Sequence, residues 1–335
     1  MYNPVIIKSA QLYKSAFPAE YGGKISSVVN VQTDDASMQK FRGEAEIGIL
    51  TSKLALNVPL AKDKLALTVA GRVSNYSIIN LISPLVPDKF GVRFGFSFGD
   101  INSNLVWKLS EKDRLKLTFF SNTDGIDVKN YGTRFWIKNN QQNLGLNWYN
   151  TISNKAENHL LGYVDNYGYD FGHSSNINNV KQINQILTGV SSAGLVDKFN
   201  YQTSDKMNIV FGGSIKGYGF SPYQINQNDS NVAAIKTTNQ SKITEGVIFA
   251  EGEYYLKKHQ FITLGMRLSI VGNSENIFIN PEPRMSYHGI FKNDYSLSIS
   301  AGRMTQPVHR AANSGLGFPF EMFLPSSVSL LPETS

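Results

Sequence analysis

The sequence predicts an all-β chain, and within that class part of an antiparallel transmembrane β-barrel with about 13 strands. Three observations support this prediction. Apolar and polar residues alternate with period two in many segments, short polar links alternate with long ones, and aromatic residues stand beside the short links.

Composition narrows the classes of protein. The chain has 335 residues, of which 41% are hydrophobic, and its mean hydropathy is −0.22. No apolar run reaches the roughly 18 residues of a transmembrane helix. Barrel strands alternate lipid-facing and lumen-facing residues, so ordinary hydropathy does not exclude them. The absence of Cys excludes disulfides and Cys-based sites. The net charge of +6 is spread singly, so no nucleic-acid partner is expected.

Period-two alternation is the primary evidence for strands. It is clearest in six segments: 53–60, 64–73, 114–121, 260–270, 283–291 and 294–301. Two others, 158–169 and 185–201, have mixed phase. In 92–109, Phe94 and Phe96 stand out of phase with Leu105 and Trp107, which predicts either a bulge near Gly99-Asp100 or a strand that extends above the membrane. Alternation alone also fits a soluble sandwich, whose apolar face meets a second sheet.

The links between strands favour the barrel. The short, polar links are 61–64, 110–114, 154–158, 203–206, 257–259 and 292–294. The links expected to be long and irregular are 74–92, 122–140, 170–184, 221–241 and 271–282. Short periplasmic turns and long extracellular loops alternate in this way in outer-membrane barrels.

Aromatic residues cluster beside the short links, where an interfacial girdle is expected. They are Trp107, Trp148, Tyr149, Phe199, Tyr201, Tyr254, Tyr255, Phe261, Phe291 and Tyr295. The ordinary β-propensity of aromatic residues is the alternative explanation for each of them taken singly.

The N-terminal part of the chain differs from the rest of it. Two short strands, 10–14 and 27–32, flank a turn that contains Pro18 and Tyr21-Gly22-Gly23, in which the glycines permit positive φ. This arrangement resembles the C-terminal end of the plug domain of TonB-dependent receptors, in which a P-x-x-Y-G motif precedes residues similar to SSVVNV. The run from Ala16 to Ser27 looks like the Bacteroidota branch of that family, although Ser15 stands where a Gly is common.

The resemblance implies two regions: residues 1–37 as the end of a plug domain, and residues 38–335 as the N-terminal part of the barrel. The implied function is TonB-energised uptake of a large solute, such as a siderophore, glycan, peptide or cofactor, across the bacterial outer membrane. The implied partners are outer-membrane lipid, TonB acting through an N-terminal region absent here, an unknown large ligand, and a surface lipoprotein as a further partner to consider. A passive porin or surface-binding barrel and a soluble all-β binding domain are the alternatives.

The ends of the chain predict a fragment. There is no export signal, the tail from residue 303 resembles an extracellular loop, and an odd number of antiparallel strands cannot close a barrel. We therefore expect the chain alone not to transport anything, and to aggregate through its two open strand edges.

Few residues are candidates for a catalytic, metal-binding or ligand-binding site. No catalytic or nucleotide-binding motif occurs and the five histidines lack metal spacing, so no enzyme activity, cofactor or metal is expected. Glu251 and Glu253 share one face of a strand and are expected to point into the lumen, as part of its hydrated wall, a plug contact or a ligand contact. Arg134 and Trp136, in a tract read as a loop, are either a ligand surface or ordinary loop packing.

Overall fold

The computed structural model describes residues 6–14, 17–76, 92–177, 180–229, 232–238, 240–273, 275–291, 295–313 and 320–335. Its architecture is all-β, as predicted. No helix in these ranges is long and apolar enough to cross a membrane.

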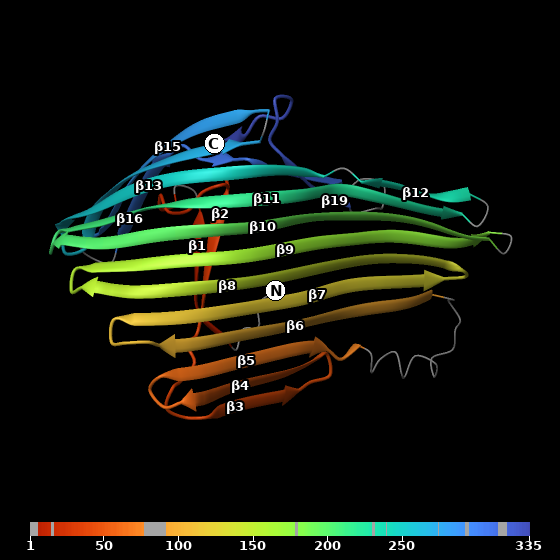
Figure 1. Ribbon diagram of the computed structural model, residues 1–335, viewed down its shortest axis with the longest axis horizontal. Coiled ribbons are helices and arrows are strands. Elements are labelled where there is room, and N and C mark those ends of the chain that lie inside the picture. The colour runs from red at the N-terminus through yellow and green to blue at the C-terminus, as the bar shows by residue number, and fades with distance from the viewer. Residues whose placement is uncertain are drawn as a thin grey trace.

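One antiparallel sheet dominates the described residues (Figure 1). Thirteen strands follow one another in it in chain order, which confirms the predicted number. They are β3 (Arg42–Ile47), β4 (Thr51–Ala61), β5 (Leu65–Ser74), β6 (Val92–Lys108), β7 (Asp113–Asn130), β8 (Thr133–Ser153), β9 (Ala156–Ile177), β10 (Val180–Ser204), β11 (Met207–Asp229), β13 (Ser241–Lys257), β14 (Gln260–Gly272), β15 (Ile277–Ile290) and β16 (Ser296–Gly302). A further strand, β12 (Val232–Thr238), pairs with the end of β11.

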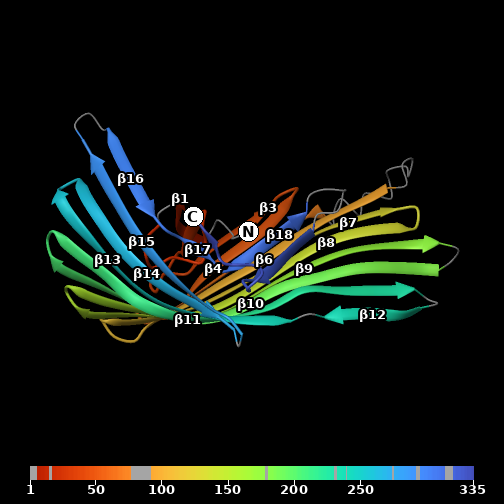
Figure 2. The same cartoon turned by 90° about the horizontal axis from the view of Figure 1, so that it is seen from above.

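The sheet curves into a trough (Figure 2). A hairpin of β1 (Ile7–Lys14) and β2 (Ser27–Thr33) lies in the hollow, close to the two strands expected from the sequence. The tail, predicted as an extracellular loop, also folds back into the hollow. It forms two small pairs, β17 (Thr305–Gln306) with β20 (Glu333–Thr334), and β18 (Val308–Asn313) with β19 (Phe320–Pro325).

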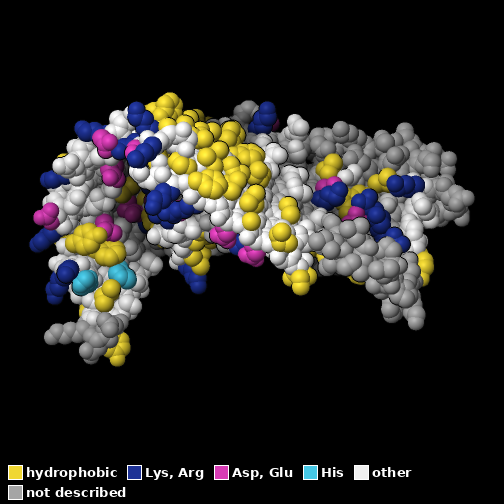
Figure 3. Space-filling model, turned by 90° about the horizontal axis from the view of Figure 1, so that it is seen from below, with side chains coloured by type: hydrophobic (Ala, Val, Ile, Leu, Met, Phe, Trp, Pro, Cys, Tyr) yellow, Lys and Arg dark blue, Asp and Glu magenta, His cyan; other side chains and the backbone are white. Residues whose placement is uncertain are grey.

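The convex face of the trough is apolar. Cross-strand pairing places Leu67, Leu105, Leu117 and Leu146 side by side in one row across β5 to β8. On β13 and β14, Ile248 and Leu264 are 65% and 61% exposed. Figure 3 shows hydrophobic side chains gathered into one large surface patch with charged side chains around it. Such a continuous apolar surface is costly in water and is the surface that a barrel presents to lipid.

The concave face of the same strands is polar. Asn102, Asn104 and Lys116 alternate with the apolar row and are buried under the N-terminal residues. One polar and one apolar face on each strand is what the period-two pattern predicted.

The expectation of long irregular links is wrong for most of the described residues. Residues 122–140 continue β7 and β8 up to a tight turn at Tyr131-Gly132, where both residues have positive φ, of 38° and 84°. β8 and β10 have 21 and 25 residues, and a membrane-crossing strand needs only about 9–11. The polar composition of these segments reflects strands that leave the membrane. Residues 77–91 of the link 74–92 lie outside the described residues, as do parts of 170–184, 221–241 and 271–282.

The phase change in 92–109 has the same cause. The register of β6 with β7 is continuous from Val92 to Lys108, so there is no bulge at Gly99-Asp100. Phe94 and Phe96 lie on the concave face of β6, which extends beyond the apolar band formed by the apolar residues of the convex face. Of the two predicted explanations, strand extension is therefore the correct one.

Candidate functional site

The loop between β1 and β2, residues 17–22, is packed against the concave face of β13, β14 and β15. Phe17 and Ala19 are almost completely buried. Gly265 of β14 makes room for the loop, since a Cβ there would lie 3.1 Å from the Cβ of Ala19. Within the loop, the Tyr21 amide donates to the Pro18 carbonyl at 3.0 Å and closes a tight turn. The backbone of Pro18 and Tyr21, both residues of the predicted motif, thus closes the turn.

Arg284 of β15 is the main contact of the loop. One guanidinium nitrogen, Nη1, donates to the carbonyl oxygens of Phe17, Pro18 and Tyr21 at 2.8, 2.7 and 2.7 Å. The guanidinium also lies over the Phe17 ring, 4.7 Å from its centroid. The second guanidinium nitrogen, Nη2, binds Glu282 at the same time, which the single nitrogen of a lysine could not do from the same position.

Arg267 of β14 holds the next part of the loop. Its Nη1 donates to the carbonyls of Ala19 and Glu20 at 3.4 and 3.2 Å, and the residue is 1% exposed. Glu251 of β13 accepts a hydrogen bond from the Ala19 amide, with 2.7 Å between its Oε2 and the Ala19 nitrogen. The backbone of the loop is therefore bound by side chains from three adjacent strands.

The charges behind this loop neutralise one another. Arg284 pairs with Glu282 at 2.6 Å, and Arg267 pairs with Glu245 at 3.4 Å. Lys216 of β11 lies 3.6 Å from Glu245. Together with Glu251 this makes three cations and three carboxylates. The cations lower the cost of burying Glu245 and Glu282, whereas Glu251 accepts the Ala19 amide and has no ion pair among the described residues. We call this cluster, with the loop backbone that it binds, the carbonyl anchor.

The two glycines of the motif have different roles. A Cβ at Gly22 would lie 2.5 Å from Cζ of the buried Arg267, so the close approach of the loop to the guanidinium requires glycine. Gly23 has open space around it but a φ of +73°, in the left-handed region. Positive φ, as predicted, explains only Gly23.

A second contact holds the residues after β2. The Asp35 carboxylate pairs with Arg114 and with Lys116, whose Nζ is 2.8 Å away and also donates to the Thr33 carbonyl at 3.0 Å. Burial raises the pKa of Asp35, but the opposing effects of Lys116 and Arg114 are larger together and hold that pKa below its usual value. We call this contact the aspartate anchor.

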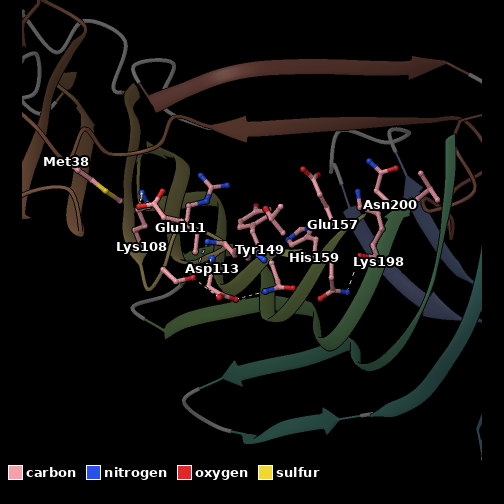
Figure 4. A pocket seen from close by; sticks show the side chains of 16 residues that line it. Met38, Lys108, Glu111, Asp113, Tyr149, Glu157, His159, Lys198 and Asn200 are labelled. Atoms are coloured by element: carbon pink, nitrogen blue, oxygen red, sulfur yellow. Dashed lines mark hydrogen bonds and ion pairs between the residues drawn. The ribbon is translucent and has the colours of Figure 1, made fainter. Parts of the chain in front are cut away.

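Two cavities run along the concave wall. One, of about 970 Å³, lies between the β1–β2 hairpin and strands β6 to β11, and the other, of about 480 Å³, lies nearer the short turns. Both are lined by Arg114, Tyr149, His159 and Lys198. Tyr149 and His159 stack at 4.3 Å, with the Arg114 guanidinium 4.4 Å from the Tyr149 ring. Figure 4 shows this stacked pair in the wall of the smaller cavity, with Lys108 on one side and Lys198 on the other.

Above the apolar band, the concave face is rich in aromatic side chains. Phe135 and Phe171 meet edge to face at 5.2 Å, and Tyr167 meets Phe323 of the tail at 5.6 Å. This wall was missed in the sequence. The phase change at Phe94–Phe98 was its only signal, because it marks where aromatic residues move to the inner face.

The predicted candidates fall in different places. Arg134 and Trp136 are in strand β8, so the expectation that they lie in a loop is wrong. They are on the convex side, where Arg134 pairs with Asp127 and the Trp136 indole donates to Asp170 at 3.0 Å. Glu253 lies on the concave face as Glu251 does, but it lines a separate pocket near the short turns. Among the described residues, no group of His, Asp and Glu side chains is arranged to hold a metal ion.

Comparison with known proteins identifies the fold. No protein-family model matches the sequence, and the search of curated proteins gives no match. Among solved structures, the siderophore receptor PirA from Acinetobacter baumannii matches with a TM-score of 0.64 and 15% identity, over 98% of this chain and 54% of the receptor. The ferripyoverdine receptor of the outer membrane of Pseudomonas aeruginosa matches with a TM-score of 0.70 and 11% identity, over 90% and 47%. The RagAB peptide transporter matches with a TM-score of 0.58 and 9% identity, over 85% and 41%.

The chain thus spans about half the length of the receptors it matches. The matched proteins are named as receptors and transporters. At such identities the likeness concerns the fold. The chain has the fold of the TonB-dependent outer-membrane receptors, whose resemblance the sequence carries in its N-terminal motif.

Proposed function

We propose that this chain is part of an outer-membrane receptor that imports a large solute with energy from TonB. In this proposal residues 1–37 are the end of the plug and residues 38–335 belong to the barrel. The aromatic wall above the membrane and the concave cavities form the route of the solute. Pro18, Tyr21, Gly22 and Gly23 shape the plug end that the carbonyl anchor holds.

The carbonyl anchor is the observation that carries the proposal. A plugged transporter requires an N-terminal segment that is bound inside the hollow, and here side chains from three adjacent barrel strands bind it. A passive porin does not require a segment that obstructs its lumen and is held there by buried ion pairs. A soluble all-β domain does not account for the continuous exposed apolar face.

The ligand class is a finer proposal. The matched siderophore receptors make ferric siderophores the first solutes to test. The matched peptide transporter makes peptides the second. We place Phe135, Tyr167 and Phe171 in the wall that contacts the solute, since rigid aromatic side chains supply large contact areas.

The test is uptake with and without TonB. Cells that lack the gene for the full-length receptor are complemented with that gene. They are given radioactive iron bound to hydroxamate or catecholate siderophores, and separately labelled peptides. Accumulation should require both the gene and TonB. Uptake that persists without TonB contradicts the mechanism. Steady ion conductance of the protein in a planar bilayer supports the porin alternative.

A further inference from the structure

The Glu282 carboxylate connects the tail of the chain to the carbonyl anchor. Its Oε2 accepts a hydrogen bond from Nη2 of Arg284 at 2.6 Å, and its Oε1 accepts one from the Thr305 hydroxyl of the tail at 2.6 Å. Glu282 and Thr305 are 0% and 1% exposed. A buried carboxylate that loses a donor is destabilised, because water does not reach it to replace the lost hydrogen bond. The tail therefore stabilises the charge that holds Arg284 against the 17–22 loop.

Glu245 provides a second connection. Its Oε1 lies 3.4 Å from Nη2 of Arg267, and its Oε2 accepts a hydrogen bond from the Tyr218 hydroxyl at 3.2 Å. The Tyr218 ring packs against an apolar cluster that consists of Phe220, Ile243 and Val271. Val308 and Phe323 of the tail pack against the same cluster. The tail is thus linked to both carboxylates that pair with the arginines of the anchor.

The path of the chain after β16 places Thr305 beside the anchor. Gly302, the last residue of β16, is paired with Arg284 in the sheet. The amide of the next residue, Arg303, donates to the Pro283 carbonyl at 2.9 Å. The chain therefore turns into the hollow next to the anchor, and the third residue after the strand reaches the anchor carboxylate.

The far part of the tail is held on the aromatic wall. The buried Thr188 hydroxyl of β10 donates to the Glu321 carbonyl at 2.8 Å, and Phe323 meets Tyr167 edge to face at 5.6 Å. In the proposed function Tyr167 belongs to the wall that contacts the solute. A solute on that wall therefore meets the β18–β19 hairpin, which occupies part of the same surface.

We propose that the tail and the 17–22 loop stabilise each other through Glu282 and Glu245, so that the plug end is fully bound only while the tail lies in the hollow. Such coupling is reciprocal, so displacing the tail weakens the loop by the factor by which loosening the loop weakens the tail. The tail thus keeps the plug end bound while no solute occupies the wall. This inference rests on the proposed function for the role of the loop as the plug end, whereas the coupling itself requires neither solute nor TonB.

The test measures backbone hydrogen exchange in the 17–22 loop of the detergent-purified protein without solute. Thr305→Val removes the tail donor of the anchor carboxylate and keeps a similar shape. Thr188→Val removes a contact between the tail and β10, away from the anchor. Thr68→Val is the matched control, because its hydroxyl bonds Asn57 on β4 and β5, at the other side of the sheet.

Exchange of the loop should be on the order of ten-fold faster in Thr305→Val, because a hydrogen bond to a buried charge is lost. It should be about three-fold faster in Thr188→Val, where the lost hydrogen bond joins neutral groups. The control Thr68→Val should exchange as the parent does. Exchange in β7 should be the same in all four proteins, which shows that the sheet is folded in each.

Equal loop exchange in the parent and Thr305→Val overturns the proposal. Faster exchange in Thr305→Val but not in Thr188→Val also overturns it, since Thr305 would then act only as a local donor. The reverse measurement uses Arg284→Lys, in which β19 should exchange faster, and unchanged exchange of β19 contradicts the reciprocity. If Thr305→Val does not fold, Thr188→Val and Arg284→Lys decide the question.

Uptake by the parent is measured in parallel, which separates this inference from the proposed function. Uptake that does not require TonB rejects the proposed function and leaves the measured coupling standing. Unchanged loop exchange in the variants, with TonB-dependent uptake by the parent, rejects the coupling and leaves the proposed function standing.

Discussion

The two anchors of the N-terminal segment differ in what they bind and in how far water reaches them. The carbonyl anchor is buried, its arginines are paired with Glu245 and Glu282, and they bind backbone oxygens of residues 17–21. The aspartate anchor binds a side chain, and the Asp35 carboxylate remains 35% exposed. The first therefore depends on the shape of the loop and the second on its charge.

This difference assigns different behaviour to the two ends of the segment. Contacts to backbone oxygens are insensitive to pH and are screened little by salt when buried. A half-exposed ion pair is weak and is weakened further by salt. We expect the carbonyl anchor to remain bound under conditions that release the aspartate anchor.

The largest effect is expected for Arg284→Ala. It leaves three carbonyls and the Glu282 carboxylate buried without their donor, which typically costs about 3–5 kcal/mol. Limited proteolysis of the detergent-purified protein should show the 17–22 loop becoming cleavable. Arg284→Lys keeps the charge and should be intermediate. A loop that stays protected in Arg284→Ala contradicts the assignment of Arg284 as its main contact.

Replacing Gly22 and Gly23 separates the effect of a steric clash from the effect of backbone strain. Gly22→Ala forces its Cβ into Arg267 and should cost about 1–3 kcal/mol, as overpacking does. Gly23→Ala meets no atom and should cost only the left-handed conformation, about 1–2 kcal/mol. The free energy of unfolding of each variant measures this order. A larger loss in Gly23→Ala would mean that the loop yields easily to Arg267.

A smaller effect is expected for Asp35→Asn. The pair is more than a third exposed, so its contribution after screening is at most about 1 kcal/mol. Cleavage near residue 35 should increase slightly, with no change at the 17–22 loop. Raising the salt concentration should have the same effect on the parent and none on the variant. Equal salt sensitivity of both proteins would count against an ion pair at this place.

A pH dependence is expected at the aspartate anchor. Because the pKa of Asp35 is lower in the folded protein than in the unfolded chain, its contribution is fully present above the unfolded value of about 3.9. That contribution is lost as the pH falls through the folded pKa. Protease protection near residue 35 should decrease in that range in the parent and stay constant in Asp35→Asn. An equal decrease in Asp35→Asn would contradict a role of the Asp35 carboxylate in this pH dependence.

The strands were predictable because alternation is a local signal. Residues 260–270 show which side chains share a face without any knowledge of the neighbouring strand. The prediction of a loop at 122–140 was wrong because Asn, Gly and Asp residues are typical of loops. Strands that extend beyond the membrane also carry polar residues, on their outer face. The polar residues in this region indicate contact with water and do not indicate an irregular backbone.

The carbonyl anchor could not be predicted from the sequence alone. Arg267 and Arg284 are visible in the sequence only as polar residues of alternating strands. Their meeting with residues 17–21 depends on the register of β13 to β15 and on the path of the N-terminal segment. Glu251 was expected to point into the lumen because its face could be deduced, with a plug contact as one of several alternatives, but no local pattern identified the loop that it binds. Arg134 and Trp136 attracted attention by composition, which does not report the side of the sheet on which they lie.

The distance along the chain between the partners of the carbonyl anchor has a consequence for assembly. Arg284 and Phe17 are separated by 267 positions, so closing this contact in an unordered chain costs about 5 kcal/mol of conformational entropy. Docking of the loop must then come after the pairing of β13, β14 and β15, which brings all of its donors together at once. A segment that is synthesised before the barrel strands is thus placed after them, and its protection from protease would report that the barrel wall has formed as far as β15.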